Sequence, residues 1–92
     1  MEESIRQVVI SFVNGNSLLF TSHDFINKLI LEDRNTYDEV LRLFHGRRAL
    51  AHAYLANYLR YHTVDLGITR DASKAMTFNV NSNISASRIW NH

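Results

Sequence analysis

The sequence predicts an α+β fold that is mainly helical, with one short strand near its start and a β-hairpin near its end. Apolar residues recur at helical spacing before residue 63, whereas β-branched and aromatic residues dominate two later runs, 64–70 and 76–80. The 92 residues suffice for one modest core, so a single domain is expected over 1–92. A hydrophobic content of 46% excludes a disordered chain.

The first two elements are a helix and a strand. Apolar residues on one face predict a helix over about 3–14, and Gly15, within the sequence NGN, is a natural left-handed end for it. The run SLLF at 17–20 is too short for a helix and predicts a single strand.

Two further helices begin at capping-box spacings. Thr21 and Asp24 have this spacing at the start of one amphipathic helix, and Thr36 with Glu39 repeats it before a short helix over 37–45. The expected buried residues of the first three helices are Ile5, Val8, Val9, Phe12, Phe25, Ile26, Leu29, Ile30, Val40, Leu43 and Phe44.

The longest helix is expected over 47–62, after Gly46 ends the preceding one. Turning about 100° per residue separates its side chains into two faces. The face expected in the core carries Leu50, Ala51, Tyr54, Leu55, Tyr58, Leu59 and Tyr61. The face expected to point outward carries Ala49, His52, Ala53, Ala56, Asn57 and Arg60.

The end of the chain is expected to form a hairpin over 64–80 and a loop-like tail. The runs 64–70 and 76–80 are the two predicted strands, and DASKA at 71–75 is the predicted loop between them. The tail, 81–92, is rich in Asn and Ser, and we expect Ile84 and Trp90 to pack it back onto the body.

Charge divides unevenly along the chain, although the formal net charge is only +1. Residues 1–45 hold seven acids and four bases, whereas 46–92 hold six bases and two acids. A basic half of this kind indicates a polyanionic partner. The acidic start differs from a signal peptide, and no apolar run reaches the roughly 20 residues needed to cross a bilayer, so a cytoplasmic location is expected.

This order of elements resembles the winged helix-turn-helix family of DNA-binding domains. The resemblance covers about residues 3–80 and depends on element order, with SLLF as the first strand and TRDASKAM as the tip of the wing. It implies a recognition helix over 47–62 and a wing over 64–80. The segment 37–45 is either an added helix or the second helix of the motif.

The resemblance implies double-stranded DNA as the partner and a role as a small transcriptional regulator or accessory factor. Arginine can pair with guanine edges and asparagine with adenine edges, while cations at a helix start suit phosphates. The predicted DNA-binding residues are Arg47, Arg48, His52, Asn57, Arg60, Arg70 and Lys74. The alternative is a protein-interaction or dimerisation module without nucleic-acid binding, and a homodimer is compatible with both functions.

Catalytic and metal-binding functions have little support in the sequence. The absence of cysteine excludes a disulfide scaffold, a thiolate zinc site and a cysteine nucleophile. The histidines of the long helix lack metal-ligand spacing, and Ser22, His23 and Asp24 are sequence neighbours that cannot assemble a triad. We therefore expect a non-enzymatic protein with no cofactor, metal or small-molecule substrate.

Overall fold

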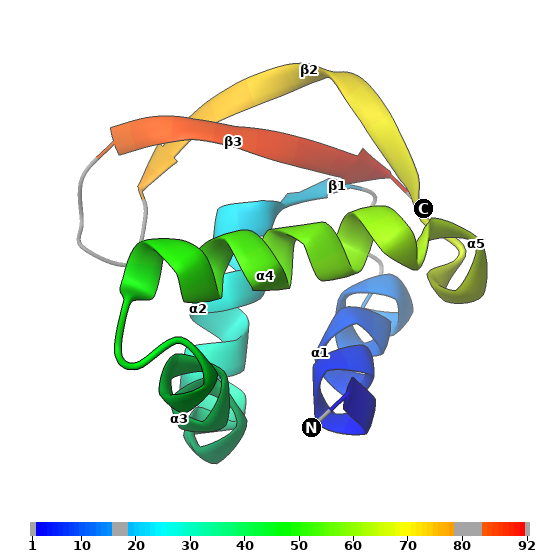
Figure 1. Ribbon diagram of the computed structural model, residues 1–92. Helices are drawn as coiled ribbons and strands as arrows, with labels where there is room; N and C mark the ends of the chain where they lie inside the picture. The colour runs from blue at the N-terminus through cyan, green and yellow to red at the C-terminus, as the bar shows by residue number, and fades with distance from the viewer. Residues whose placement is uncertain (1, 16–18, 79–83, 92) are drawn as a thin grey trace.

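The computed structural model is mainly helical and carries a small antiparallel sheet, which confirms the α+β class (Figure 1). It describes residues 2–15, 19–78 and 84–91, and only the backbone for 72–78 and 84–86. The elements are α1 (Glu2–Asn14), β1 (Leu19–Thr21), α2 (Ser22–Glu32), α3 (Arg34–Leu43), α4 (Arg48–Tyr61), α5 (Thr63–Leu66), β2 (Thr69–Phe78) and β3 (Ile84–Asn91).

The caps of α2 and α3 explain where these helices start. Thr21 and Asp24 form the predicted capping box of α2, each side chain accepting the other residue's amide proton. The capping box predicted at Thr36 is wrong, because Asp33 caps α3 and accepts the Thr36 amide and hydroxyl protons. Helix α3 therefore starts and ends earlier than the predicted range, 37–45.

The turn between α3 and α4 bends through two residues in the left-handed region. His45 has φ 54° and Gly46 has φ 78°, and the Gly46 amide donates to the Leu41 carbonyl over 2.8 Å. This confirms Gly46 as part of the end of the preceding helix. Helix α4 lies within the predicted range, 47–62.

The predicted strand 64–70 is wrong over its first half. Residues Thr63–Leu66 form the short helix α5, which ends at Gly67 with φ 67°. The Ile68 amide then donates to the Thr63 carbonyl over 3.0 Å. Leu66 and Ile68 are buried in the core at this turn. Their alternating spacing fits a strand, but it comes from a short helix and the turn that follows it.

The hairpin is shifted towards the C-terminus relative to the prediction. The expected loop, 71–75, is part of β2, and most of the expected loop-like tail is β3, the central strand in the order β1-β3-β2. The residues joining β2 to β3 are 79–83, outside the described part of the chain, so TRDASKAM is not the tip. A register irregularity between Arg70 and Lys74 marks the place where the loop was expected.

Polar anchors account for the position of β3. The buried Trp90 indole donates to the Ser22 hydroxyl over 3.0 Å, and Ser87 accepts the His23 amide proton over 3.1 Å. Both bonds tie β3 to the start of α2, where β1 also pairs with residues 89–91. The prediction that Trp90 packs onto the body is confirmed, whereas the side chain of Ile84 lies outside the described residues.

One cluster of buried side chains joins all the helices to the sheet. Its largest fully buried members are Trp90, Phe25, Ile5, Leu29, Leu55, Leu59, Val9 and Val40. Three residues expected in this core are instead exposed: Leu43 by 57%, Leu50 by 47% and Tyr61 by 72%. Among the described residues, no helix has the length and apolar character needed to cross a membrane.

Candidate nucleic-acid interface

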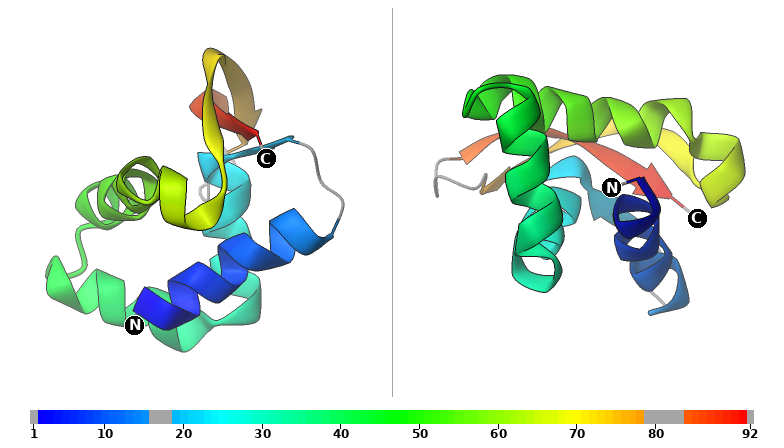
Figure 2. Two further views of the ribbon diagram at one scale, coloured as in Figure 1. Left: turned by 90° about the vertical axis from the view of Figure 1, so that its right-hand side faces the viewer. Right: turned by 60° about the horizontal axis from the view of Figure 1, so that its bottom comes forward.

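Helix α4 lies at one side of the molecule, with the sheet above it and no other described element in front of it in the view of Figure 1. Figure 2 shows the same helix nearly end-on, beside the sheet and away from α1. Its buried side consists of Ala51, Leu55, Tyr58 and Leu59. Its exposed side carries Ala49, Leu50, Ala53, Asn57, Arg60 and Tyr61, which we call the outward face. The predicted outward face is therefore confirmed only in part: Ala49, Ala53, Asn57 and Arg60 are exposed, whereas His52 and Ala56 are half-buried.

Four of the predicted DNA-binding residues lie on or beside this outward face. Asn57 and Arg60 belong to it, and Arg47 and Arg48 are exposed where α4 begins. His52 is not on it, which corrects the prediction. The cause is a hydrogen bond that draws the half-buried His52 ring towards α3.

The prediction that Arg70 and Lys74 lie at the tip of a wing is wrong. Both belong to strand β2, and Arg70 is exposed at its beginning, shortly after α5. Lys74 pairs in register with Arg88 of β3, although the position of its side chain lies outside the description. Arg47 and Arg48 thus lie at the start of α4 and Arg60 in its last turn, whereas Arg70 and Lys74 belong to β2.

The outward face lies within a stretch of the sequence that has no acids. Between Glu39 and Asp65 the sequence has neither Asp nor Glu, while it holds four arginines and three histidines. Two of these, Arg42 and His45, are exposed at the α3–α4 turn and are absent from the predicted set. The acid-free stretch in the sequence identifies them. A comparison of residues 1–45 with 46–92 conceals this stretch, because the division falls inside it.

The beginning of α4 is electrostatically unfavourable for a helix. Helix dipoles favour acids in the first turn, yet α4 has none there and starts with Arg47 and Arg48. At the N-cap, Arg47 makes no capping hydrogen bond to any described residue, in contrast to the side-chain caps of α2 and α3. The start of α4 therefore lacks the favourable charges and the side-chain cap with which a helix usually begins.

Apolar and aromatic side chains extend the outward face. Leu50 and Tyr61 were expected in the core because both fit the apolar period, but they lie at its edge and are exposed. The Arg60 guanidinium lies 5.8 Å from the centroid of the Tyr61 ring. The face thus combines small methyl groups with one large aliphatic side chain, one aromatic ring, one amide and one guanidinium.

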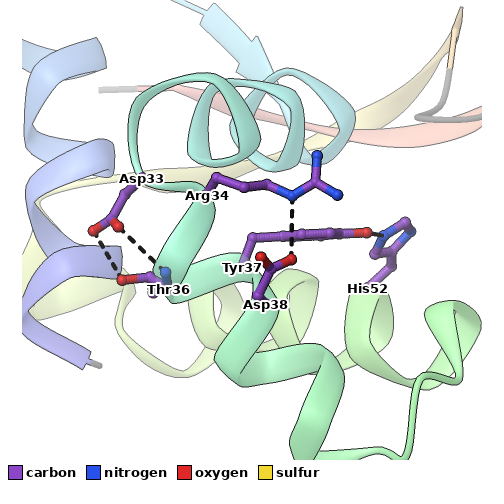
Figure 3. A network of polar contacts seen from close by, with 6 residues as sticks. All are labelled: Asp33, Arg34, Thr36, Tyr37, Asp38 and His52. Carbon is purple, nitrogen blue, oxygen red and sulfur yellow. Dashed lines mark hydrogen bonds and ion pairs between the residues drawn. The ribbon is translucent and has the colours of Figure 1, made fainter.

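A hydrogen-bonded pair links α3 to α4 behind the outward face (Figure 3). The Tyr37 hydroxyl and His52 Nε2 are 2.7 Å apart, and their rings are tilted by 42° at 5.7 Å. Tyr37 is 3% exposed, and Arg34 lies 5.5 Å from the centroid of its ring while pairing with Asp38 over 3.1 Å. The pair fixes the two helices against each other at the level of His52.

Burial favours the neutral forms of both His52 and Tyr37. Burial lowers the pKa of His52 below its ordinary value of 6.5, and Arg48 and His23 lower it further. Burial also raises the pKa of Tyr37 above 10.0, an effect that Arg48 and Arg34 partly oppose. His52 is therefore uncharged at neutral pH, so it adds no cation to the outward face of the free protein.

The side formed by α1 and the end of α2 has the opposite charge. A cleft of about 260 Å³ there is lined by Glu3, Ser4, Gln7, Val8, Glu32 and Asp33. No group of three metal-ligating side chains occurs within the part of the chain that the structure describes. Three of the six residues that line this cleft are therefore acidic.

Comparisons with protein-family models, with curated proteins and with solved structures find no match to this chain. Its function therefore has to be inferred from the chemistry of its own residues. The outward face of α4 and the basic α3–α4 turn beside it are the part of the surface on which that inference depends.

Proposed function

We propose that this protein binds double-stranded DNA through the outward face of α4 and the basic turn before it, as a small regulator or accessory factor. The observation that carries the proposal is an exposed helix face set in a stretch of 25 residues without an acid, with four arginines. A face that serves only solvation would carry acids as well. Phosphates are the ligand that an acid-free, arginine-rich surface suits best.

The composition of the outward face suits close approach to a groove. Ala49 and Ala53 let the helix backbone come near base edges, and longer side chains can reach past them. Asn57 is suited to the N6 and N7 positions of adenine, and Arg60 to the O6 and N7 positions of guanine. At the other end of α4, Arg47 has the exposure needed to contact phosphates and position the helix.

The order of elements supports a winged helix-turn-helix arrangement. β1 pairs with the hairpin through β3, as the first strand of that family does. Four helices, α2 to α5, lie between β1 and β2. Of these, α3 and α4 fit the turn motif best, because a four-residue turn with Gly46 joins them. In this arrangement α2 is the added helix and α4 is the recognition helix.

The hairpin is the proposed wing, although its cations are not at a tip. β1 pairs with residues 89–91 of β3, so the pairs from Lys74–Arg88 to Phe78–Ile84 extend beyond it as a two-stranded ribbon. Figures 1 and 2 show this ribbon reaching the same end of the molecule at which α4 begins. A basic pair at the base of such a ribbon suits the phosphate backbone.

The salt dependence of duplex binding tests the proposal. Fluorescence anisotropy with a labelled duplex at several salt concentrations gives the slope of log K against log salt, which reports the number of phosphates neutralised. Arg47→Gln is expected to reduce that slope by about one and to weaken binding to all duplexes. Arg60→Gln is expected to weaken binding in a sequence-dependent manner. Lys28→Gln, which removes a cation paired with Glu32 on α2, is the control and leaves the slope unchanged.

Two results contradict the proposal. One is the absence of duplex binding at low salt. The other is binding that Lys28→Gln reduces as much as Arg47→Gln does, because the interaction would then follow net charge and not the outward face.

Exposed apolar side chains favour a second candidate function, self-association through α4 and α5. Leu50, Tyr61 and Val64, the last exposed by 92%, line this side of the molecule. Light scattering distinguishes the two: a mass of two chains that Leu50→Glu and Tyr61→Glu reduce to one favours the interaction module. A dimer that these changes leave intact, joined instead through α1, is compatible with paired half-sites about 34 Å apart on DNA.

A further inference from the structure

His52 occupies the border between the core and the outward face of α4. Its ring is half-buried and bonded to the Tyr37 hydroxyl, while the exposed Ala49 and Ala53 flank it along the helix. It is therefore close to the surface that we propose to meet DNA, yet its side chain is directed towards α3 (Figure 3). A buried contact at such a border is sensitive to what covers the neighbouring surface.

The ionisable groups around His52 come from three helices. Tyr37 on α3 bonds to the ring, with Arg34 and Asp38 next to Tyr37. Arg48 precedes His52 by one turn of α4, and His23 at the start of α2 also acts on it. The nearby charges that the structure describes as acting on the ring are thus basic. A proton on His52 is disfavoured until negative charge arrives from outside.

We propose that His52 is a conditional cation of this surface, uncharged and bonded to Tyr37 while the outward face is free, and protonated when a polyanion covers it. The inference deepens the proposed function and rests on it. Phosphates near Arg48 offset the repulsion that keeps the ring neutral, and the proton comes from solvent. In the charged ring both nitrogens are donors, so Nε2 donates to the Tyr37 oxygen and the pair persists in both states.

The consequence is proton uptake on binding. Because free protein and complex differ in their affinity for a proton, binding strengthens as the pH decreases through the range in which His52 titrates. Folding responds in the opposite direction, since the charged ring is disfavoured in the free protein. Stability that decreases on acidification while duplex affinity increases is a combination that a purely structural histidine does not produce.

Isothermal titration calorimetry measures the uptake directly. Duplex is titrated into the whole protein near pH 6 in two buffers with different ionisation enthalpies, and the difference in heat gives the number of protons taken up. We expect a substantial fraction of one proton, which His52→Gln removes because glutamine keeps a polar group near Tyr37 but does not titrate. His62→Gln, which changes another half-buried histidine, paired with Asp65, is the control and leaves the uptake unchanged.

A second measurement needs no variant. The NMR titration of the His52 ring in the wild-type protein is expected to move to higher pH when duplex is present. Duplex binding without proton uptake, uptake that His52→Gln leaves unchanged, or a ring titration that duplex does not move overturns this inference and leaves the proposed function intact. Failure to bind any duplex overturns both.

Discussion

Helices α1 and α4 have nearly the same length, 13 and 14 residues, and each buries one side in the same core, but their exposed residues differ. α1 begins with Glu2 and Glu3, and acids at this position interact favourably with the helix dipole. The Gln7 side chain, one turn later, donates a hydrogen bond to Glu3. α4 begins with Arg47 and Arg48, where cations oppose the dipole. The exposed residues of α1 stabilise the helix that carries them, whereas those at the start of α4 do not.

Helix stability accounts for the exposed residues of α1 but not for those at the start of α4. In α1, the acids of the first turn and the bond between Gln7 and Glu3 explain the exposed residues without a binding partner. The start of α4 has neither an acid in its first turn nor a side-chain cap bond among the described residues, and an anion bound there would add a partner for its arginines. Measuring folding and binding in the same variants separates residues that stabilise the fold from residues that bind a partner.

The largest expected effect distinguishes the buried side of α4 from its outward face. Leu55→Ala removes a fully buried side chain and is expected to lower the free energy of unfolding by about 2–5 kcal/mol. Leu50→Ala makes the same chemical change at a residue exposed by 47%, and we expect less than about 1 kcal/mol. Urea denaturation measures both. Equal losses would mean that Leu50 is covered in solution, as self-association requires.

The next two predictions change the N-caps of α2 and α4, and the free energy of unfolding is expected to change in opposite directions. Thr21→Ala breaks the capping box of α2 and is expected to destabilise the protein by about 1 kcal/mol. Arg47→Ser places a capping hydroxyl at an N-cap that already has extended backbone, so we expect stabilisation of about 0.5–1 kcal/mol. The same serine removes a proposed phosphate contact and should weaken duplex binding. Stabilisation without any loss of binding would show that Arg47 has no role in the interface.

The smallest expected effect is a dependence of stability on pH that comes from His52. Its pKa is lowered in the folded state, so the unfolded chain binds the proton more readily below pH 6.5. The stabilisation is therefore complete above pH 6.5 and decreases as the pH falls through the folded-state pKa. Denaturation curves between pH 8 and 5 should show this decrease, and His52→Gln should flatten it while His62→Gln does not. An unchanged decrease in His52→Gln would assign it to other groups.

The helices were predictable because their signals are local. The spacing of Thr21 and Asp24 predicted the start of α2, and Gly46 with the helical period after it predicted the extent of α4. The cap of α3 was misplaced because Asp33 and Thr36 both have capping side chains, and only their hydrogen bond identifies the acceptor. A sequence pattern cannot choose between two adjacent caps without the geometry of the chain.

The sheet was less predictable because its determinants are distant in sequence. Half of the residues of β3 are Ser, Asn or Ala, which are typical of loops, but Trp90 and Ser87 anchor the strand to residues more than 60 positions away. At the candidate site, the exposure of Asn57 and Arg60 followed from the helical period, and that of Arg47 and Arg48 from their position at the start of α4. The position of His52 did not, because it depends on Tyr37 of another helix.

Amide chemical-shift mapping with a duplex tests the comparison of α1 and α4 most directly. In the isotopically labelled protein we expect the largest changes at residues 42–60, which include the α3–α4 turn and the outward face, and little change at residues 2–14. This pattern would identify α4 as the surface that meets DNA. Changes concentrated on α1 and the acidic cleft, or no change at low salt, would contradict the account.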